Sequence, residues 1–138
     1  MTRKKARELA FKLLYQIEIQ KESPQYILDI YYGENSLEEK EREYVEDVLF
    51  GSHKNKHEIN GIISRLLEGW RIERLTKISL SIITLSVYEI LYRQDIPDSV
   101  SISEAVTLAK RYEGPEAASF VNGVLASVLK EKGARERE

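Results

Sequence analysis

The segment Ser119-Phe120-Val121-Asn122-Gly123-Val124-Leu125 is apolar enough for a buried helix, yet it carries an amide and a glycine. Glycine inside a helix costs about 1 kcal/mol relative to alanine. A sequence that keeps a glycine there usually needs another helix or a ligand to approach the backbone closely. Taken alone, the segment favours close helix packing at Gly123 over close approach of a ligand. The rest of the chain has to decide between these two interpretations.

Apolar residues recur at spacings of three and four along most of the chain, as in amphipathic helices. The pattern predicts about seven helices, no strand and short connections, which is an all-α protein whose neighbouring helices pack as bundles. The expected helices cover residues 3–20, 24–32, 36–51, 55–68, 75–93, 101–112 and 115–130.

Several expected helix ends rest on local signals. Ser23 followed by proline predicts a helix start. The segments 36–39 and 101–104 both match the capping-box pattern, in which a serine caps the helix. Gly51 is expected to close or interrupt its helix, and Trp70 is expected to plug a bundle.

The composition fits a globular protein of one domain. The chain has 138 residues, of which 42% are hydrophobic and 32% charged. We expect a single domain over 1–130 and a charged, frayed tail over 131–138. The sequence shows no membrane-length apolar run and no signal peptide, so a cytoplasmic protein is expected.

Charge is unevenly distributed along the chain. Residues 1–12 hold five basic side chains and one acidic one, whereas residues 22–47 hold nine acidic and two basic ones. A basic end favours polyanions, because each lysine or arginine placed on a phosphate releases counterions. The alternative is an ordinary solvated helix terminus.

No motif predicts catalysis or a cofactor. Phosphate-binding, dinucleotide-binding and nucleophile-elbow patterns are missing from the sequence, and cysteine is absent. His53 and His57 have a zinc-like spacing, but no further ligand pattern supports a metal. Glu89 lies among apolar residues and needs a partner if it is buried. The sequence therefore favours a binding module over an enzyme.

Three segments together resemble the NusB family of bacterial transcription antitermination factors. The first runs from Arg3 to Tyr15 and is similar to that family's RxxARExAxxxLY opening helix. The second begins with WRIERL at 70–75 and continues to 97, and the third contains EAVTLAK at 104–110 and FVNGVL at 120–125. The resemblance spans nearly the whole chain.

The resemblance implies two small packed helical bundles and a non-enzymatic RNA-binding factor without a cofactor. Members of the family bind boxA RNA of ribosomal RNA leader transcripts, together with the small-subunit ribosomal protein NusE. The pair joins an elongating RNA polymerase with other Nus factors and suppresses termination. Some members form homodimers.

The resemblance also implies site residues. Basic side chains of the first helix would contact phosphates, Phe120 would stack on an unpaired base, and Asn122 would donate to RNA. The expected RNA-binding residues are Arg3, Lys4, Lys5, Arg7, Lys12, Lys110, Arg111, Phe120 and Asn122. For Phe120, plain core packing is the open alternative. Tyr15 and Ser79 are expected on the surface that faces the ribosomal partner.

This chain departs from the pattern at four positions. Ser79 stands where the family often has an acidic residue, and Thr84 where it often has arginine. Ser103 stands in place of an asparagine, and Ser119 in place of a lysine. The first two changes put charge-based docking of the ribosomal partner in doubt.

Two other functions stay open at this point. Ribosomal RNA cytosine methyltransferases carry an N-terminal domain that resembles NusB, but they need a cofactor-binding domain and a catalytic cysteine. A helical scaffold that binds only proteins is the other alternative.

Overall fold

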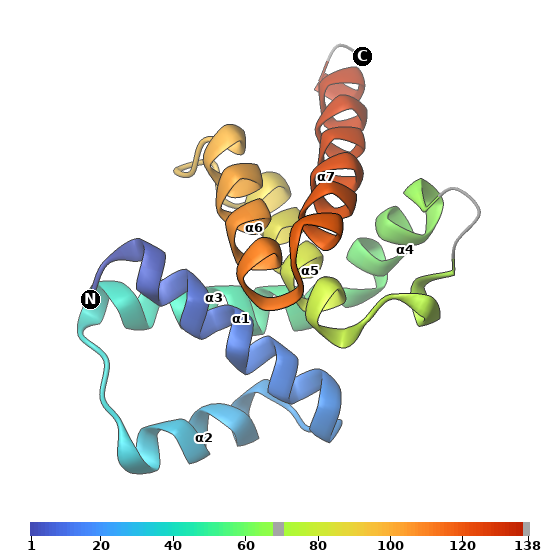
Figure 1. The fold of residues 1–138 in the computed structure, drawn as a ribbon. Helices are drawn as coiled ribbons and strands as arrows, with labels where there is room; N and C mark the ends of the chain where they lie inside the picture. The colour runs from blue at the N-terminus through green and yellow to red at the C-terminus, as the bar shows by residue number, and fades with distance from the viewer. Residues whose placement is uncertain (68–70, 137–138) are drawn as a thin grey trace.

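The computed structural model describes residues 1–67 and 71–136 (Figure 1), and within them it contains seven α-helices, one short 3₁₀ helix and no strand. The helices are α1 (Arg3–Gln20), α2 (Pro24–Glu34), α3 (Glu39–Lys54), α4 (Lys56–Leu66), η1 (Ile72–Arg74), α5 (Lys77–Tyr92), α6 (Asp98–Glu113) and α7 (Pro115–Glu136). The expected all-α fold is confirmed. Trp70, expected to plug a bundle, lies outside the described residues.

The helices form two groups that meet on α5. In Figure 1, α1, α2 and α3 lie together in the lower part of the molecule, and α6 and α7 rise side by side above them. Helix α5 packs on α1 and α3 on one side and on α6 and α7 on the other. Its residues from Ser81 to Ile90 are buried, apart from the half-buried Thr84. A helix that is apolar on nearly all sides belongs at the centre of a fold.

Side chains cap three of the helices. The hydroxyl oxygens of Thr2, Ser23 and Thr76 accept hydrogen bonds from backbone N–H groups in the first turns of α1, α2 and α5, at 3.1, 3.1 and 3.0 Å. Each bond satisfies a donor that has no partner within its helix. The start predicted at Ser23 is confirmed, whereas the cap at Thr76 was not predicted from the sequence.

Both predicted capping boxes are wrong. Helix α3 begins at Glu39 after Glu38, which makes no side-chain cap, so Ser36 lies outside the helix. Helix α6 begins at Asp98, directly after Pro97, so Ser101 lies inside the helix. The Ser101 hydroxyl donates instead to the buried carboxylate of Glu89, at 2.7 Å. The hydroxyl that the capping-box pattern predicted to cap the helix thus serves as a hydrogen-bond donor to the buried carboxylate of Glu89.

Gly51 does not end its helix, because α3 continues through it to Lys54. A Cβ atom at position 51 would overlap the ring and hydroxyl of Tyr88 on α5. Glycine is therefore needed here for the close approach of a side chain from another helix, and not for a turn.

Helix α7 also runs past its expected end near Lys130, as far as Glu136. Lys132 explains part of the extension, since its ammonium donates to the carbonyl oxygen of Ile90 at 2.9 Å and lies 3.2 Å from Asp98. The segment expected to fray is helical over its described part. No helix in the described part of the chain is both long and apolar enough to cross a membrane.

Candidate nucleic-acid interface

The residues expected to bind RNA lie at the start of α1, the end of α6 and the first half of α7. Side chains bridge α1 and α6, which are far apart in the sequence. Arg111 donates to Glu8 at 2.9 Å, and the rings of Phe11 and Tyr112 meet edge to face with centroids 5.0 Å apart. Gly114, with a φ of 102°, then turns the chain from α6 directly into α7. The fold therefore brings two of the three segments expected to bind RNA, those on α1 and α6, next to each other.

The start of α1 presents an exposed basic cluster, formed by Arg3, Lys4 and Lys5. Lys4 is held only loosely, 4.0 Å from Glu104, and Arg3 lies over the Tyr44 ring, 4.6 Å from its centroid. These residues form the first turn of α1, whose N–H groups point toward the helix start. A helix N-terminus favours anions, and the three cations add to this preference. Lys12 is also exposed, two turns further along.

Arg7 does not belong to this cluster, and its predicted role as a phosphate contact is wrong. Its exposed fraction is 3%, and its Nε donates to Glu89 Oε2 at 2.9 Å. The hydroxyl of Tyr44 donates to the same oxygen, and Ser101 donates to the other. The second turn of α1 faces the core, so the i, i+4 spacing from Arg3 leads inward. The prediction that a buried Glu89 has a partner is confirmed.

The guanidinium of Arg7 stays protonated in this buried site. Burial by itself lowers the pKa of Arg7, but the charge of Glu89, the nearby Tyr44 and the hydrogen bond to Glu89 together outweigh it, so the pKa is raised above its ordinary value. Burial and the charge of Glu89 raise the pKa of Tyr44, which keeps its proton. One nitrogen of Arg7, Nη2, has no hydrogen-bond partner. Removing one partner of such a pair destabilises the protein, because the other charge stays buried.

Lys110 and Arg111 are exposed at the end of α6, where cations suit the negative end of the helix dipole. Arg111 is partly neutralised by Glu8, which also accepts a hydrogen bond from Tyr112 at 2.6 Å. The hydrogen bond from Tyr112, and then that from Arg111, lower the pKa of Glu8. Glu8 thus joins α1 to α6 beneath the basic surface, a role that its own sequence context did not reveal.

The first half of α7 has a buried side and an open one. Phe120 is half-buried, whereas Asn122 and Gly123 are exposed. A cavity of about 340 Å³ opens between α7 and the end of α4. The residues around it are Leu66, Leu67, Ser119, Phe120, Gly123, Val124 and Ser127.

Gly123 does not serve helix packing. A Cβ atom at this position would have no heavy atom from the rest of the fold within 4 Å. The packing interpretation of this glycine is wrong, and its exposed backbone borders the cavity beside Phe120. The remaining alternative from the sequence, close approach of a ligand, fits this geometry.

The two residues expected to face the ribosomal partner differ in exposure. Tyr15 is half-buried on α1, and Ser79 is 6% exposed near the start of α5. The hydroxyls of Ser79 and Thr76 both donate to Glu113, at 2.6 and 2.8 Å. An acidic group from the end of α6 therefore lies beside Ser79, although position 79 itself carries no charge.

The structure also places the other departures from the family pattern. Thr84 is half-buried and lines a separate cavity, which is bordered by the first five α-helices. Ser103 and Ser119 are exposed, and Ser119 borders the cavity beside Phe120. Among the described residues, no group of three or more His, Cys, Asp or Glu side chains is arranged to hold a metal ion.

Comparison with known sequences gives matches over nearly the full length. The model of the NusB family matches residues 4–130. A transcription antitermination protein NusB from Acetivibrio thermocellus is 46% identical over 132 residues, which cover 96% of this chain and 91% of the relative. The same-named protein of Listeria monocytogenes serotype 4a is 40% identical over 131 residues, covering 95% and 98%.

Solved structures show the same fold. T. maritima NusB superimposes with a TM-score of 0.87 at 34% identity, covering 95% of this chain and 92% of that one. A chain from a crystal structure of the antitermination factors NusB and NusE in complex with dsRNA gives a TM-score of 0.84 at 28% identity, covering 94% and 96%. With the family model, the close relatives and the fold in agreement, this chain belongs to the NusB family.

Proposed function

We propose that this chain is a transcription antitermination factor that binds single-stranded boxA-type RNA of ribosomal RNA leader transcripts together with the ribosomal protein NusE. The exposed basic cluster on the first turn of α1, Arg3, Lys4 and Lys5, is the observation that carries the proposal. The names of its relatives support antitermination, and the solved complex of NusB and NusE with dsRNA supports RNA and NusE as partners.

The site divides into two parts with different tasks. The basic cluster, with Lys12, Lys110 and Arg111, neutralises phosphates and so provides affinity without reading sequence. The cavity between α4 and α7 receives an unpaired base, which stacks on the exposed part of Phe120. Asn122, which is exposed on the same turn of α7 but does not line the cavity, donates to the RNA beside it. Stacking of this kind contributes about 1–3 kcal/mol per base.

The partner surface lies around Tyr15 and Ser79. The carboxylate of Glu113, held by the hydroxyls of Ser79 and Thr76, supplies negative charge there for a basic side chain of NusE. The pair then joins an elongating RNA polymerase with other Nus factors in the cytoplasm. The factor performs no catalysis, and residues 1–130 act as one domain.

Fluorescence anisotropy with labelled boxA-type RNA, in the presence and absence of NusE, tests the proposal. We expect NusE to tighten RNA binding at least tenfold, and Glu113→Gln to reduce this gain while binding of RNA to the chain alone is unchanged. Glu116→Gln, an exposed carboxylate on the first turn of α7, is the control. Binding of NusE without any binding of RNA would favour a purely protein-binding scaffold instead.

A further inference from the structure

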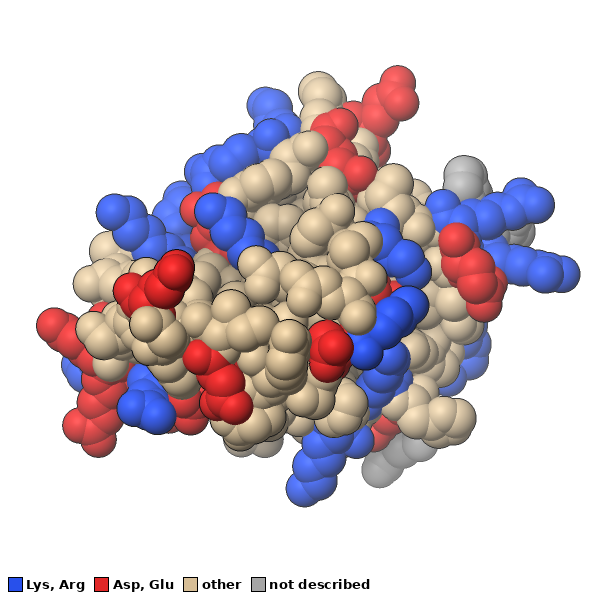
Figure 2. Space-filling model, turned by 90° about the horizontal axis from the view of Figure 1, so that it is seen from below, with Lys and Arg blue, Asp and Glu red and all other residues tan. Residues whose placement is uncertain are grey.

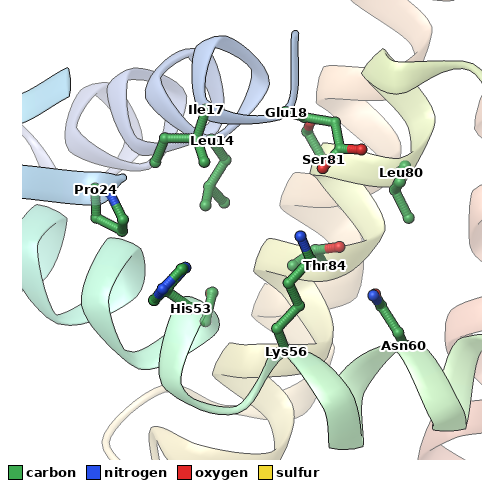
Figure 3. Close-up of a pocket in the computed structure, with 11 residues that line it drawn as sticks. Leu14, Ile17, Glu18, Pro24, His53, Lys56, Asn60, Leu80, Ser81 and Thr84 are labelled. Atoms are coloured by element: carbon green, nitrogen blue, oxygen red, sulfur yellow. The ribbon is translucent and has the colours of Figure 1, made fainter. Parts of the chain in front are cut away.

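A second cavity lies where the two groups of helices meet, away from the residues assigned to RNA. Its volume is about 70 Å³, and its lining comes from α1, α2, α3, α4 and α5. Figure 3 shows Leu14 and Ile17 pointing into it from α1, with Lys56 and His53 on the opposite side. One side of the cavity is therefore apolar, and the other is polar.

Ser52 gives the cavity an unmatched polar group. Its side chain lines the cavity and is 3% exposed, and its Oγ has no hydrogen-bond partner. Other hydroxyls on helices avoid this state by donating to the carbonyl four residues earlier, as Ser81 does to Lys77 at 2.7 Å. A buried hydroxyl without a partner is destabilising, so this one is available to a polar group that enters the cavity.

The charges around the cavity leave an excess cation. Glu18 is already engaged by Lys77 at 3.1 Å and by Lys21 at 3.7 Å. Burial raises the pKa of Glu18, but the hydrogen bond from Lys77 and the nearby lysines outweigh it, so the pKa is lowered and the carboxylate is ionised. Lys56 acts on Glu18 through space and makes no ion pair with a described residue. Figure 3 shows its ammonium directed toward Thr84, inside the cavity.

The volume of this cavity and the residues that line it together indicate which kind of ligand fits. A volume of 70 Å³ holds about five to seven non-hydrogen atoms, at about 10–15 Å³ for each water-sized group. A purely apolar molecule of this size would leave Ser52 Oγ without a partner and would make no use of the exposed ammonium of Lys56, and an inorganic anion would not pack against the apolar side.

We propose that this cavity binds a short branched aliphatic carboxylate of about four or five carbon atoms. Its hydrocarbon part packs against Leu14, Ile17 and Leu80, and its carboxylate accepts hydrogen bonds from Ser52 Oγ and Lys56 Nζ. None of the lining residues is among those assigned above to RNA contact or to the partner surface around Tyr15 and Ser79.

Titration of the ¹⁵N-labelled full chain with sodium isovalerate, followed by amide chemical shifts at constant ionic strength, tests the proposal. We expect saturable shifts at the end of α1, the start of α2 and the α3–α4 junction, with a dissociation constant in the millimolar range. Isovaleramide, which has the same shape without the charge, should bind at least tenfold more weakly.

Three variants complete the test. Lys56→Gln and Ser52→Ala should each weaken isovalerate binding severalfold, whereas Lys54→Gln, an exposed neighbour at the end of α3, should leave it unchanged. Ser52→Ala should not lower the melting temperature, because the hydroxyl has no bond to lose within the chain. Shifts that stay linear up to about 50 mM, equal binding of the amide, or unchanged binding by Lys56→Gln would each overturn the proposal.

Discussion

Arg7 contributes to stability in the core, whereas basic residues next to it in the sequence are exposed and available to RNA. Its neighbours in the family motif, Lys4 and Lys5, are exposed, while Arg7 pairs with Glu89 in the core. Two further side chains, Tyr44 and Ser101, complete the bonding of Glu89. Basic residues of one motif therefore serve two different purposes.

Arg7→Ala should lower the free energy of unfolding by about 3–5 kcal/mol, because it leaves the Glu89 carboxylate buried without its cation. Urea denaturation measures this change. The double variant Arg7→Met, Glu89→Leu should recover part of the loss, since no charge is then left in the core, while the hydroxyls of Tyr44 and Ser101 lose their acceptor. A stable Arg7→Ala protein whose RNA binding alone is weakened would contradict the structure.

Glu8 makes stability depend on acid pH. The hydrogen bond from Tyr112 and the contact with Arg111 lower its pKa in the folded protein from 4.5, so Glu8 contributes stability above the unfolded pKa. That contribution is lost as the pH falls through the lower, folded pKa.

Glu8→Gln should accordingly lower the melting temperature at pH 7 and lose this effect once the pH has fallen through the lowered, folded pKa of Glu8, where both proteins carry a neutral side chain. Glu22→Gln, an exposed residue between α1 and α2, is the control and should show little change at either pH. An equal loss for Glu8→Gln at both pH values would show that its charge is not what stabilises the contact.

The sequence predicts part of this site. An isolated glutamate among apolar residues indicates that Glu89 needs a partner, but its partner Arg7 lies 82 positions away. The direction in which the second turn of α1 faces depends on where α5 packs. A pattern within one helix contains no information on that packing, so the sequence alone groups Arg7 with its exposed neighbours.

At the scale of the elements, hydrophobic spacing predicted the number and order of helices, and local signals placed their ends less well. Ser36 and Ser101 both matched a capping box, yet neither caps a helix. Such signals compete with tertiary partners, as the bond from Ser101 to Glu89 shows. The two glycines Gly51 and Gly123 illustrate the same point, because one is enclosed by Tyr88 and the other is open.

Gly51→Ala should lower stability by about 1–3 kcal/mol through overpacking against Tyr88, despite the better helix propensity of alanine. Gly61→Ala on α4 is a matched control, since nothing lies within 4 Å of its added methyl group. That control should gain up to about 1 kcal/mol. A gain for both variants in urea denaturation would mean that Tyr88 does not pack on α3 as described.

Gly123→Ala should have opposite effects on stability and on binding. Its open surroundings predict a gain of about 0.5–1 kcal/mol in unfolding free energy. RNA affinity should fall at the same time, because the added methyl group lies at the edge of the cavity beside Phe120. Gly61→Ala should gain similar stability with unchanged RNA affinity. Unchanged affinity in Gly123→Ala would remove this cavity from the RNA site.

At the scale of the whole molecule, exposed apolar side chains lie on α2, whereas the exposed basic cluster lies at the start of α1. Helix α2 lies lowest in Figure 1, and the view from below in Figure 2 shows a broad uncharged area with charged groups of both signs around it. Tyr26 and Ile30 of α2 are 48% and 54% exposed. The basic cluster of α1 lies instead beside α6, which the sequence alone did not show.

The central claim is that the first turn of α1 contacts RNA phosphates, and the salt dependence of RNA binding tests it most directly. Lys4→Ala, Lys5→Ala in one chain is compared with Lys54→Ala, an exposed lysine at the end of α3, by filter binding to boxA-type RNA.

For single-stranded RNA, the slope of log K against log salt changes by about 0.7 for each phosphate that the protein no longer neutralises. The double variant should therefore have a slope that is shallower by about 1.4, while the control keeps the original slope. A double variant with an unchanged slope and affinity would contradict the assignment of α1 to RNA.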